Sequence, residues 1–149
     1  MEIADPISSI LHQKSSRLWQ VSPDETVLTA IQLMAEQNVG ALLVMDGGSL
    51  VGMVSERDYT RRVMLKGKSS KDTPVREIMS AEVVHVTPCS SVEDCLSLMT
   101  SRRVRHLPVM DDNRVVGLVS TGDLVRWIIS AQKAHIDQLG NYIMGAYPA

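Results

Sequence analysis

The chain has 149 residues, a formal net charge of -2, 44% hydrophobic residues and only 3% aromatic residues. That length fits one compact domain or two very small ones, and the slight acidic excess argues against a protein dedicated to nucleic acid or membrane surfaces. No apolar run approaches the roughly 20 residues that cross a bilayer, and the first ten residues lack the basic start of a secretory signal. We therefore expect a cytoplasmic protein that binds neither nucleic acid nor membrane.

The first half of the chain predicts helices and strands in a clear order. In 1–14, apolar residues recur at helical spacing, and they do so again after Thr26, whose hydroxyl can accept the first free N–H groups of a helix. The turn Asp46-Gly47-Gly48 then separates two apolar runs, as in a β-hairpin. In chain order, the predicted elements after the first helix are an extended stretch at 17–21, a helix after Thr26, strands at 42–45 and 50–54, and a helix at 56–65.

The second half of the chain repeats the first. Residues 21–64 align without a gap to residues 86–129 at an offset of 65, and sixteen of the forty-four pairs are identical. The chain is therefore a tandem duplication. In this half, the predicted elements are an extended stretch at 83–86, a helix after Ser91, strands at 107–110 and 115–119 around the turn 111–113, and a helix from 121 to about 132.

Each half is marginal as an independent domain, because a unit of about 60 residues buries too little of its surface. We therefore expect an α/β (α+β) fold in which two tandem β-α-β-β-α units pack sheet to sheet about a pseudo-two-fold axis. A polar linker with a short apolar docking helix joins them. The expected divisions are an N-terminal helical extension, unit one, the linker, unit two and a C-terminal helical extension, at 1–14, 15–66, 67–79, 80–131 and 132–149.

Apolar residues recur at helical spacing at both ends of the chain, outside the repeat. We expect the C-terminal helix to run to about Leu139 and to stop at Gly140. The apolar faces of these ends either contact a second copy or pack back on the same chain. We favour a homodimer.

One motif closes both hairpins. The pattern Gly-hydrophobic-Val-Ser-x-x-Asp occupies residues 52–58 and 117–123, where a strand leads into a helix. Free N–H groups at a helix start favour an anion such as phosphate, the serine can donate to a phosphate oxygen, and the aspartate suits the two hydroxyls of a ribose. The Ser-x-x-Asp spacing is also a helix-capping pattern. The motif alone leaves both interpretations open.

The combined pattern resembles a tandem pair of cystathionine-beta-synthase (CBS) domains, the regulatory Bateman module. The resemblance covers roughly residues 15–130 and is carried by three repeated stretches: VSPDETVLTAIQLM and VTPCSSVEDCLSLM, NVGALLVMD and RVRHLPVMD, and LVGMVSERD and VVGLVSTGD. It implies a β-α-β-β-α fold for each unit and two pseudo-symmetric clefts that bind adenine nucleotides. It also implies that chains pair further, into discs of four units.

The resemblance implies a set of nucleotide-binding residues. Ribose would be bound by Asp58 and Asp123, and phosphate by Ser55, Ser120 and Thr121. The adenine would lie against the start of a hairpin strand, at Gly40, Ala41 and Leu42 in one cleft and at Arg105, His106, Leu107 and Pro108 in the other. The entry strands would close the pockets at Trp19, Gln20, Val83, Val84 and His85.

The two clefts are not equivalent in sequence. Arg57 and Arg105 offer planar guanidinium groups that suit phosphate oxygens, and neither has a basic counterpart in the other unit. We therefore expect the clefts to differ in affinity or in preferred nucleotide. The basic runs 61–62 and 102–105 are either solvated faces or anion-binding groups, and His106 either packs in the fold or contacts the ligand.

Three functions are compatible with this pattern. We favour a sensor of AMP, ADP, ATP or NAD that regulates a separate partner, through a difference in ligand affinity between two arrangements of the units. The alternative is a structural dimerisation module whose motifs only cap helices. The third is an enzyme acting on nucleotides, for which the sequence arranges no activated nucleophile, base or metal-ligand cluster. We expect no enzymatic activity and no metal.

Overall fold

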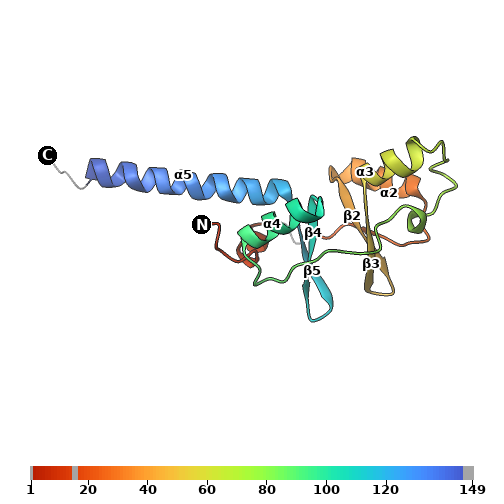
Figure 1. Ribbon diagram of the computed structural model, residues 1–149, viewed down its shortest axis with the longest axis horizontal. Helices are drawn as coiled ribbons and strands as arrows, with labels where there is room; N and C mark the ends of the chain where they lie inside the picture. The colour runs from red at the N-terminus through yellow and green to blue at the C-terminus, as the bar shows by residue number, and fades with distance from the viewer. Residues whose placement is uncertain (1, 15–16, 146–149) are drawn as a thin grey trace.

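The computed structural model describes residues 2–14 and 17–145. It shows two small α+β units joined by the linker, with one long helix extending away from the second unit (Figure 1). In chain order the elements are α1 (Ser8–Gln13), β1 (Gln20–Val21), α2 (Val27–Gln37), β2 (Ala41–Asp46), β3 (Ser49–Ser55), α3 (Glu56–Tyr59), the π-helix η1 (Thr60–Met64), the 3₁₀ helix η2 (Val75–Glu77), α4 (Val92–Arg102), β4 (His106–Asp111), β5 (Arg114–Ser120) and α5 (Thr121–Gly145).

The two hairpins have the same register, which confirms the duplication at the level of the backbone. In unit one β2 pairs antiparallel with β3 and Leu42 faces Val54; in unit two β4 pairs antiparallel with β5 and Leu107 faces Val119. The pairing shifts at equivalent points, after Val44 and after Val109. Both predicted turns are present, since two residues in each have positive φ, as the two-residue hairpin turn requires.

The entry stretches differ between the units. In unit one β1 pairs parallel with β2, and Leu43 N donates to Trp19 O at 3.2 Å. In unit two the expected strand at 83–86 is reduced to a single bridge between Val86 and Val109. The residue equivalent to Leu43 is Pro108, which has no N–H to donate to the entry stretch. The second sheet therefore has two strands where the first has three.

The helices largely follow the prediction. Thr26 accepts a hydrogen bond from Thr29 N at the start of α2, and α4 begins with a capping box between Ser91 and Asp94. The helix predicted at 56–65 is α-helical only through Tyr59 and then widens into the π-helix η1. The expected stop at Gly140 is wrong: α5 continues to Gly145, since a glycine inside a helix costs only about 1 kcal/mol relative to alanine.

Each unit has its own hydrophobic core, and each core is completed by a segment from outside that unit. Val75 and Ile78 of the linker are fully buried in the core of unit one, and Ile7 and Ile10 of the N-terminal segment are buried in that of unit two. The backbone contacts are equivalent, because Val75 N donates to Glu25 O, and Ile7 N to Ser90 O, at 2.8 Å. The two sheets meet along β3 and β5.

The motif glycines lie where these completing segments cross β3 and β5. A methyl group on Gly52 would lie 2.7 Å from Met79 Sδ and 2.9 Å from the Ser80 carbonyl oxygen, whereas on Gly117 it would lie 2.6 Å from Leu11 Cδ2. A leucine side chain can shift more readily than a hydrogen-bonded backbone carbonyl. We expect Gly52→Ala to lower the free energy of unfolding by about 2 kcal/mol and Gly117→Ala by about 1 kcal/mol. Urea denaturation measures both, and a larger loss at Gly117 would contradict this account.

Candidate functional site

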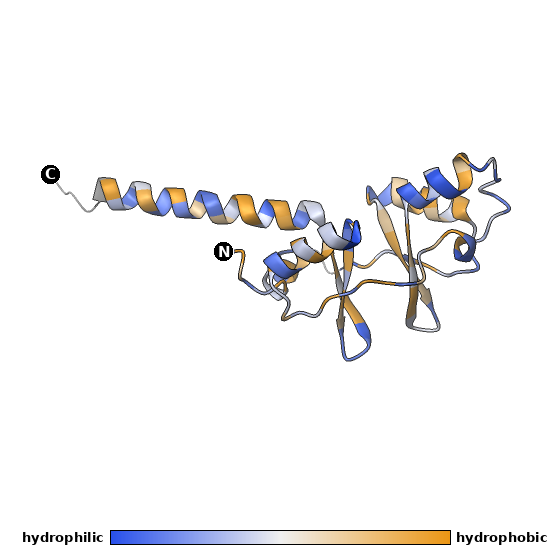
Figure 2. Ribbon diagram, viewed as in Figure 1, coloured by the Kyte–Doolittle hydropathy of each residue, from blue (hydrophilic) through white to orange (hydrophobic). Residues whose placement is uncertain are grey.

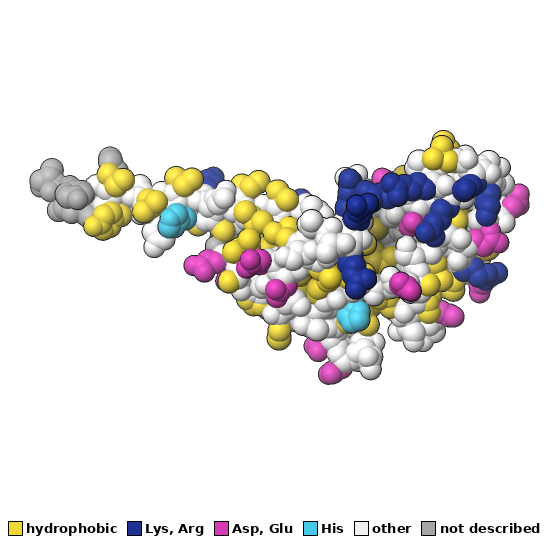
Figure 3. Space-filling view, viewed as in Figure 1, with side chains coloured by type: hydrophobic (Ala, Val, Ile, Leu, Met, Phe, Trp, Pro, Cys, Tyr) yellow, Lys and Arg dark blue, Asp and Glu magenta, His cyan; other side chains and the backbone are white. Residues whose placement is uncertain are grey.

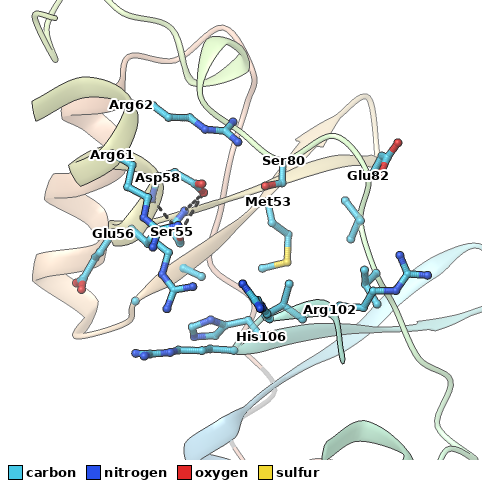
Figure 4. Close-up of a pocket in the computed structure, with 18 residues that line it drawn as sticks. Met53, Ser55, Glu56, Asp58, Arg61, Arg62, Ser80, Glu82, Arg102 and His106 are labelled. Atoms are coloured by element: carbon cyan, nitrogen blue, oxygen red, sulfur yellow. Dashed lines mark hydrogen bonds between the residues drawn. The ribbon is translucent and has the colours of Figure 1, made fainter. Parts of the chain in front are cut away.

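A cavity of about 440 Å³ lies at the junction of the two units. We call it cavity one (Figure 4). Unit one contributes the start of β2, the end of β3, α3 and η1; the stretch that follows the linker contributes Ser80 and Glu82. Unit two contributes the end of α4 and the start of β4. Both halves of the duplication therefore build one cavity.

Asp58 in the wall of cavity one belongs to a capping box at the start of α3. Its Oδ2 accepts hydrogen bonds from Ser55 N at 2.9 Å and from Ser55 Oγ at 3.0 Å. Its Oδ1 accepts none from the part of the chain that the structure describes. Capping and ligand binding are thus compatible here, because capping uses one carboxylate oxygen and leaves the other at the cavity wall.

Two backbone N–H groups at this helix start are not free, contrary to the sequence-based expectation. Glu56 N donates to Gly40 O at 3.1 Å, and Asp58 N donates to Ser55 Oγ at 3.2 Å. The first bond holds the start of α3 against the residue that precedes β2, and the second lies within the helix cap. Attraction for an anion at this site therefore has to come mainly from side chains.

Arginine side chains supply that attraction. All six that line cavity one are exposed, and they face only three acids in its wall, Glu56, Asp58 and Glu82. Figure 3 shows basic side chains gathered over the junction of the two units. The six are Arg57, Arg61, Arg62, Arg102, Arg103 and Arg105.

His106 forms part of the wall of cavity one and also packs beside Gly40, where a methyl group would lie 3.7 Å from its Cε1. Burial lowers the pKa of His106 below its usual value; the nearby Asp123 opposes this shift, while Lys14 and Arg105 add to it. The imidazole is therefore neutral at neutral pH and offers one donor and one acceptor. Packing and cavity lining, the two roles weighed from the sequence, coexist in this residue.

Half of the expected site residues come together in cavity one. They are Gly40, Ala41, Ser55, Arg57, Asp58, Val83, Val84, Arg105 and His106. The grouping differs from the expectation, since Arg105 and His106 were assigned to the other cleft but share this cavity with Asp58. Eight expected residues line neither cavity one nor the second cavity, which is described below: Trp19, Gln20, Leu42, His85, Leu107, Pro108, Ser120 and Thr121. Leu42, Leu107 and Pro108 are instead buried.

Several residues that line cavity one are not predictable from the sequence. Met53, Ser80, Glu82 and Val104 carried no motif signal. The arginines at 61–62 and 102–103 did carry one, as the basic runs, but a charged run alone does not distinguish a solvated face from a binding wall.

A second cavity, of about 360 Å³, lies beside Asp123 and is lined by Ile10, Gln13, Lys14, Asp123, Arg126, Trp127 and Ser130. We call it cavity two. The side chain of Asp123 is only 5% exposed. Its Oδ2 accepts from Lys14 Nζ at 2.6 Å and from Ser120 N at 2.8 Å, and its Oδ1 accepts from Arg126 at 2.5 Å. Both carboxylate oxygens are therefore already occupied.

The electrostatics of Asp123 match this arrangement. Burial alone would raise its pKa, but the hydrogen bonds from Lys14 and from the Ser120 backbone outweigh that effect and hold the pKa below its usual value. Lys14 also donates to Leu118 O at 2.7 Å, so its ammonium bridges β5 and Asp123. The two repeated aspartates thus differ in structure: Asp58 keeps an oxygen available and Asp123 does not.

The chain belongs to the CBS-domain family, whose model matches residues 10–65 and 75–130. It is 39% identical over 151 residues to the "CBS domain-containing protein CBSX3, mitochondrial" of Arabidopsis thaliana, over 95% of this chain and 73% of that protein. A CBS-domain protein of Burkholderia ambifaria has a solved structure that is 46% identical, with a TM-score of 0.83 over 85% of this chain and 96% of that one. These matches confirm the tandem pair of CBS domains.

A more distant structure shares the fold. The CBS domain pair of protein MJ0100, solved in complex with methylthioadenosine and S-adenosyl-L-methionine, is 23% identical to this chain. Its TM-score is 0.77, and the match covers 86% of this chain and 98% of that one.

Residues 2–14 and 17–145 make up the described part of the chain. They contain no group of three or more histidine, cysteine or acidic side chains placed to hold a metal ion. Among the same residues, no helix has a stretch both long and apolar enough to cross a bilayer.

Proposed function

We propose that this chain is a regulatory module that binds an adenine nucleotide in cavity one. The observation that carries the proposal is the position of Asp58, with one carboxylate oxygen unbonded within the described chain, in the wall of a large cavity rich in arginine. A carboxylate accepts hydrogen bonds from the vicinal hydroxyls of a ribose, and guanidinium groups bind phosphate. The adenosine compounds bound to the CBS pair of MJ0100 are in keeping with this proposal.

The lining suggests how such a ligand would lie. The ribose would contact Asp58 and Ser55, and the adenine would lie between the start of β2 and the apolar side chains of Met53, Val83 and Val84. The phosphates would point toward the arginines. One nucleotide would bind per chain, because Lys14 and Arg126 already occupy the equivalent aspartate in cavity two.

Binding at this place would couple to the arrangement of the units. Cavity one is lined by both units and by the stretch 80–84 that follows the linker, so a ligand that contacts all three favours the arrangement in which they fit it best. A separate protein would recognise the arrangement of the units that the ligand favours. We assign no catalytic role, and the expected cytoplasmic location stays a prediction, given a relative named as mitochondrial.

Titration calorimetry with AMP, ADP, ATP and NAD tests the proposal. We expect one nucleotide per chain and a rise in the unfolding midpoint with the ligand, because the ligand binds only the folded state. The 2′-deoxy form of the best ligand should bind at least several-fold more weakly, since Asp58 loses a hydroxyl partner. Absence of binding by all four at millimolar concentration, or equal binding of the 2′-deoxy form, would contradict the proposal.

We also propose that two chains pair through α5. Its far half leaves the body of the protein and carries exposed apolar positions (Figure 2). Ile129, Ile136 and Ile143 recur every seven residues and are 58%, 65% and 61% exposed, with Leu139 between the last two. Such spacing forms the seam of a two-stranded coiled coil. Sedimentation should show a dimer that Ile136→Asp converts to a monomer; a monomeric wild-type chain would contradict this.

A further inference from the structure

The arginines of cavity one are more numerous than a nucleoside with a single phosphate needs. Five of them, Arg57, Arg61, Arg102, Arg103 and Arg105, donate no side-chain hydrogen bond to any described residue, and Arg62 alone is engaged, with Ile78 O at 2.9 Å. Like charges gathered at one place repel one another, so such a cluster weakens the folded state unless a counter-charge is present.

The duplication provides an internal control for this cluster. If the fold itself required these arginines, the equivalent positions of the other half would carry them too. Instead, five of the six have uncharged counterparts at the offset of 65, and only Arg61 is matched by an arginine, Arg126. The other pairs are Arg57 with Gly122, Arg62 with Trp127, Arg102 with Gln37, Arg103 with Asn38, and Arg105 with Gly40. The cluster of six arginines at cavity one therefore has no equivalent in the other half of each repeated pair, where only Arg126 is basic.

The arginines also lie on more than one side of the cavity. Arg61 and Arg62 lie with Asp58 on the side formed by α3 and η1, and Arg102 lies across the cavity with His106 (Figure 4). Arg103 and Arg105 follow Arg102 in the same turn into β4. A ribose held at Asp58 places its first phosphate near the arginines of unit one. Further phosphates would extend from there toward the side of the cavity where Arg102 lies.

We propose that cavity one selects an adenine nucleotide that carries two or more phosphates over a monophosphate or an uncharged adenosine compound. Arg102, Arg103 and Arg105 of unit two bind the outer phosphates, and the ligand thereby ties unit two to unit one. This inference rests on the proposed function and narrows its ligand class. Guanidinium groups suit the role because each offers paired donors to phosphate oxygens.

The test is a calorimetric series of adenosine, AMP, ADP, ATP and inorganic tripolyphosphate, titrated without divalent cations at two salt concentrations. We expect affinity to rise at least tenfold from AMP to ADP or ATP, and raised salt to weaken ATP binding more than AMP binding. The triple variant Arg102→Gln/Arg103→Asn/Arg105→Gln should lose most of that tenfold gain and keep the affinity for AMP within about threefold. Two of these substitutions introduce the residues that the other half carries, so the backbone accepts them.

Arg114→Gln is the matched control. Arg114 is an exposed residue at the start of β5, next to the hairpin turn, and it is absent from the lining of cavity one, so the variant removes one positive charge elsewhere. It should leave the gain from AMP to ATP unchanged. Equal affinities for AMP and ATP, or a triple variant that weakens both equally, would overturn the inference and leave the proposed function standing. If tripolyphosphate bound and none of the adenine nucleotides did, both the inference and the proposed function would be overturned, since the anion alone would then be the ligand.

Discussion

Replacing Asp58 with asparagine is expected to weaken nucleotide binding in cavity one by at least tenfold while the protein stays folded. The carboxylate is the acceptor proposed for the ribose hydroxyls, and a hydrogen bond to a charged group contributes about 1.5–3 kcal/mol. Asparagine has nearly the same shape, and its carbonyl oxygen can still accept the bond from Ser55 N that completes the capping box. The affected quantity is therefore the dissociation constant, which calorimetry measures directly.

Asp94→Asn is the control for the capping role of Asp58. Asp94 and Ser91 form the same capping box at the start of α4, with Asp94 N donating to Ser91 Oγ at 3.0 Å, and they are absent from the lining of cavity one. Both variants should lower the unfolding midpoint by similar small amounts, as a weakened cap does. Only the Asp58 variant should lose nucleotide affinity. If both bind like the wild type, Asp58 serves only as a cap, as in a structural dimerisation module.

Local signals in the sequence predicted the elements well because the physics that fixes them is local. Thr26 and Ser91 cap helices, and both hairpin turns contain residues that tolerate positive φ. The prediction of an entry strand at 83–86 in unit two was wrong for an equally local reason, because Pro108 has no N–H to donate. That reason could be applied only once the pairing of the entry stretch with β4 was known.

The N-terminal segment belongs to the structural repeat, outside the aligned range 21–64 and 86–129. Residues 5–11 (DPISSIL) and 73–79 (TPVREIM) are equivalent in structure, since Pro6 bridges to Ser91 as Pro74 does to Thr26. Their offset is 68, three residues more than the offset of the rest. An alignment without gaps therefore missed the likeness, and the segment was expected to be an extension. In the structure, its isoleucines complete the core of unit two.

The candidate site was predictable in its chemistry but not in its grouping. The repeated motif identified Asp58 and Ser55, and a capping box and a ligand contact can share them because they use different oxygens. Which segments face Asp58 depends on how the units pack, so the sequence grouped Arg105 and His106 with the other cleft, whereas both line cavity one together with Asp58. The ion pair between Lys14 and Asp123 could not be predicted either, since Lys14 lies 109 positions away and belongs to no motif.

Replacing Lys14 with methionine is expected to lower the free energy of unfolding by about 2 kcal/mol, because it leaves the buried Asp123 with one cation instead of two. The folded pKa of Asp123 lies below its ordinary value of 3.8. A depressed carboxyl pKa stabilises the folded state above the unfolded pKa, and that contribution is lost as the pH falls through the folded pKa. The difference between wild type and variant should therefore be full at neutral pH and shrink below about pH 4. Urea denaturation across this range measures it.

Two further variants separate the ion pair from the loss of a lysine as such. Lys68 pairs with Glu77 at 3.9 Å with both side chains about half exposed, so Lys68→Met should change stability by less than about 0.5 kcal/mol. Adding Asp123→Asn to Lys14→Met removes the buried charge that lost one of its two cations, so the double variant should be more stable than Lys14→Met alone. Two results together would show that Asp123 does not need this lysine: Lys14→Met is as stable as Lys68→Met, and the double variant is no more stable than Lys14→Met. The difference between the two cavities would then have to come from Arg126 alone.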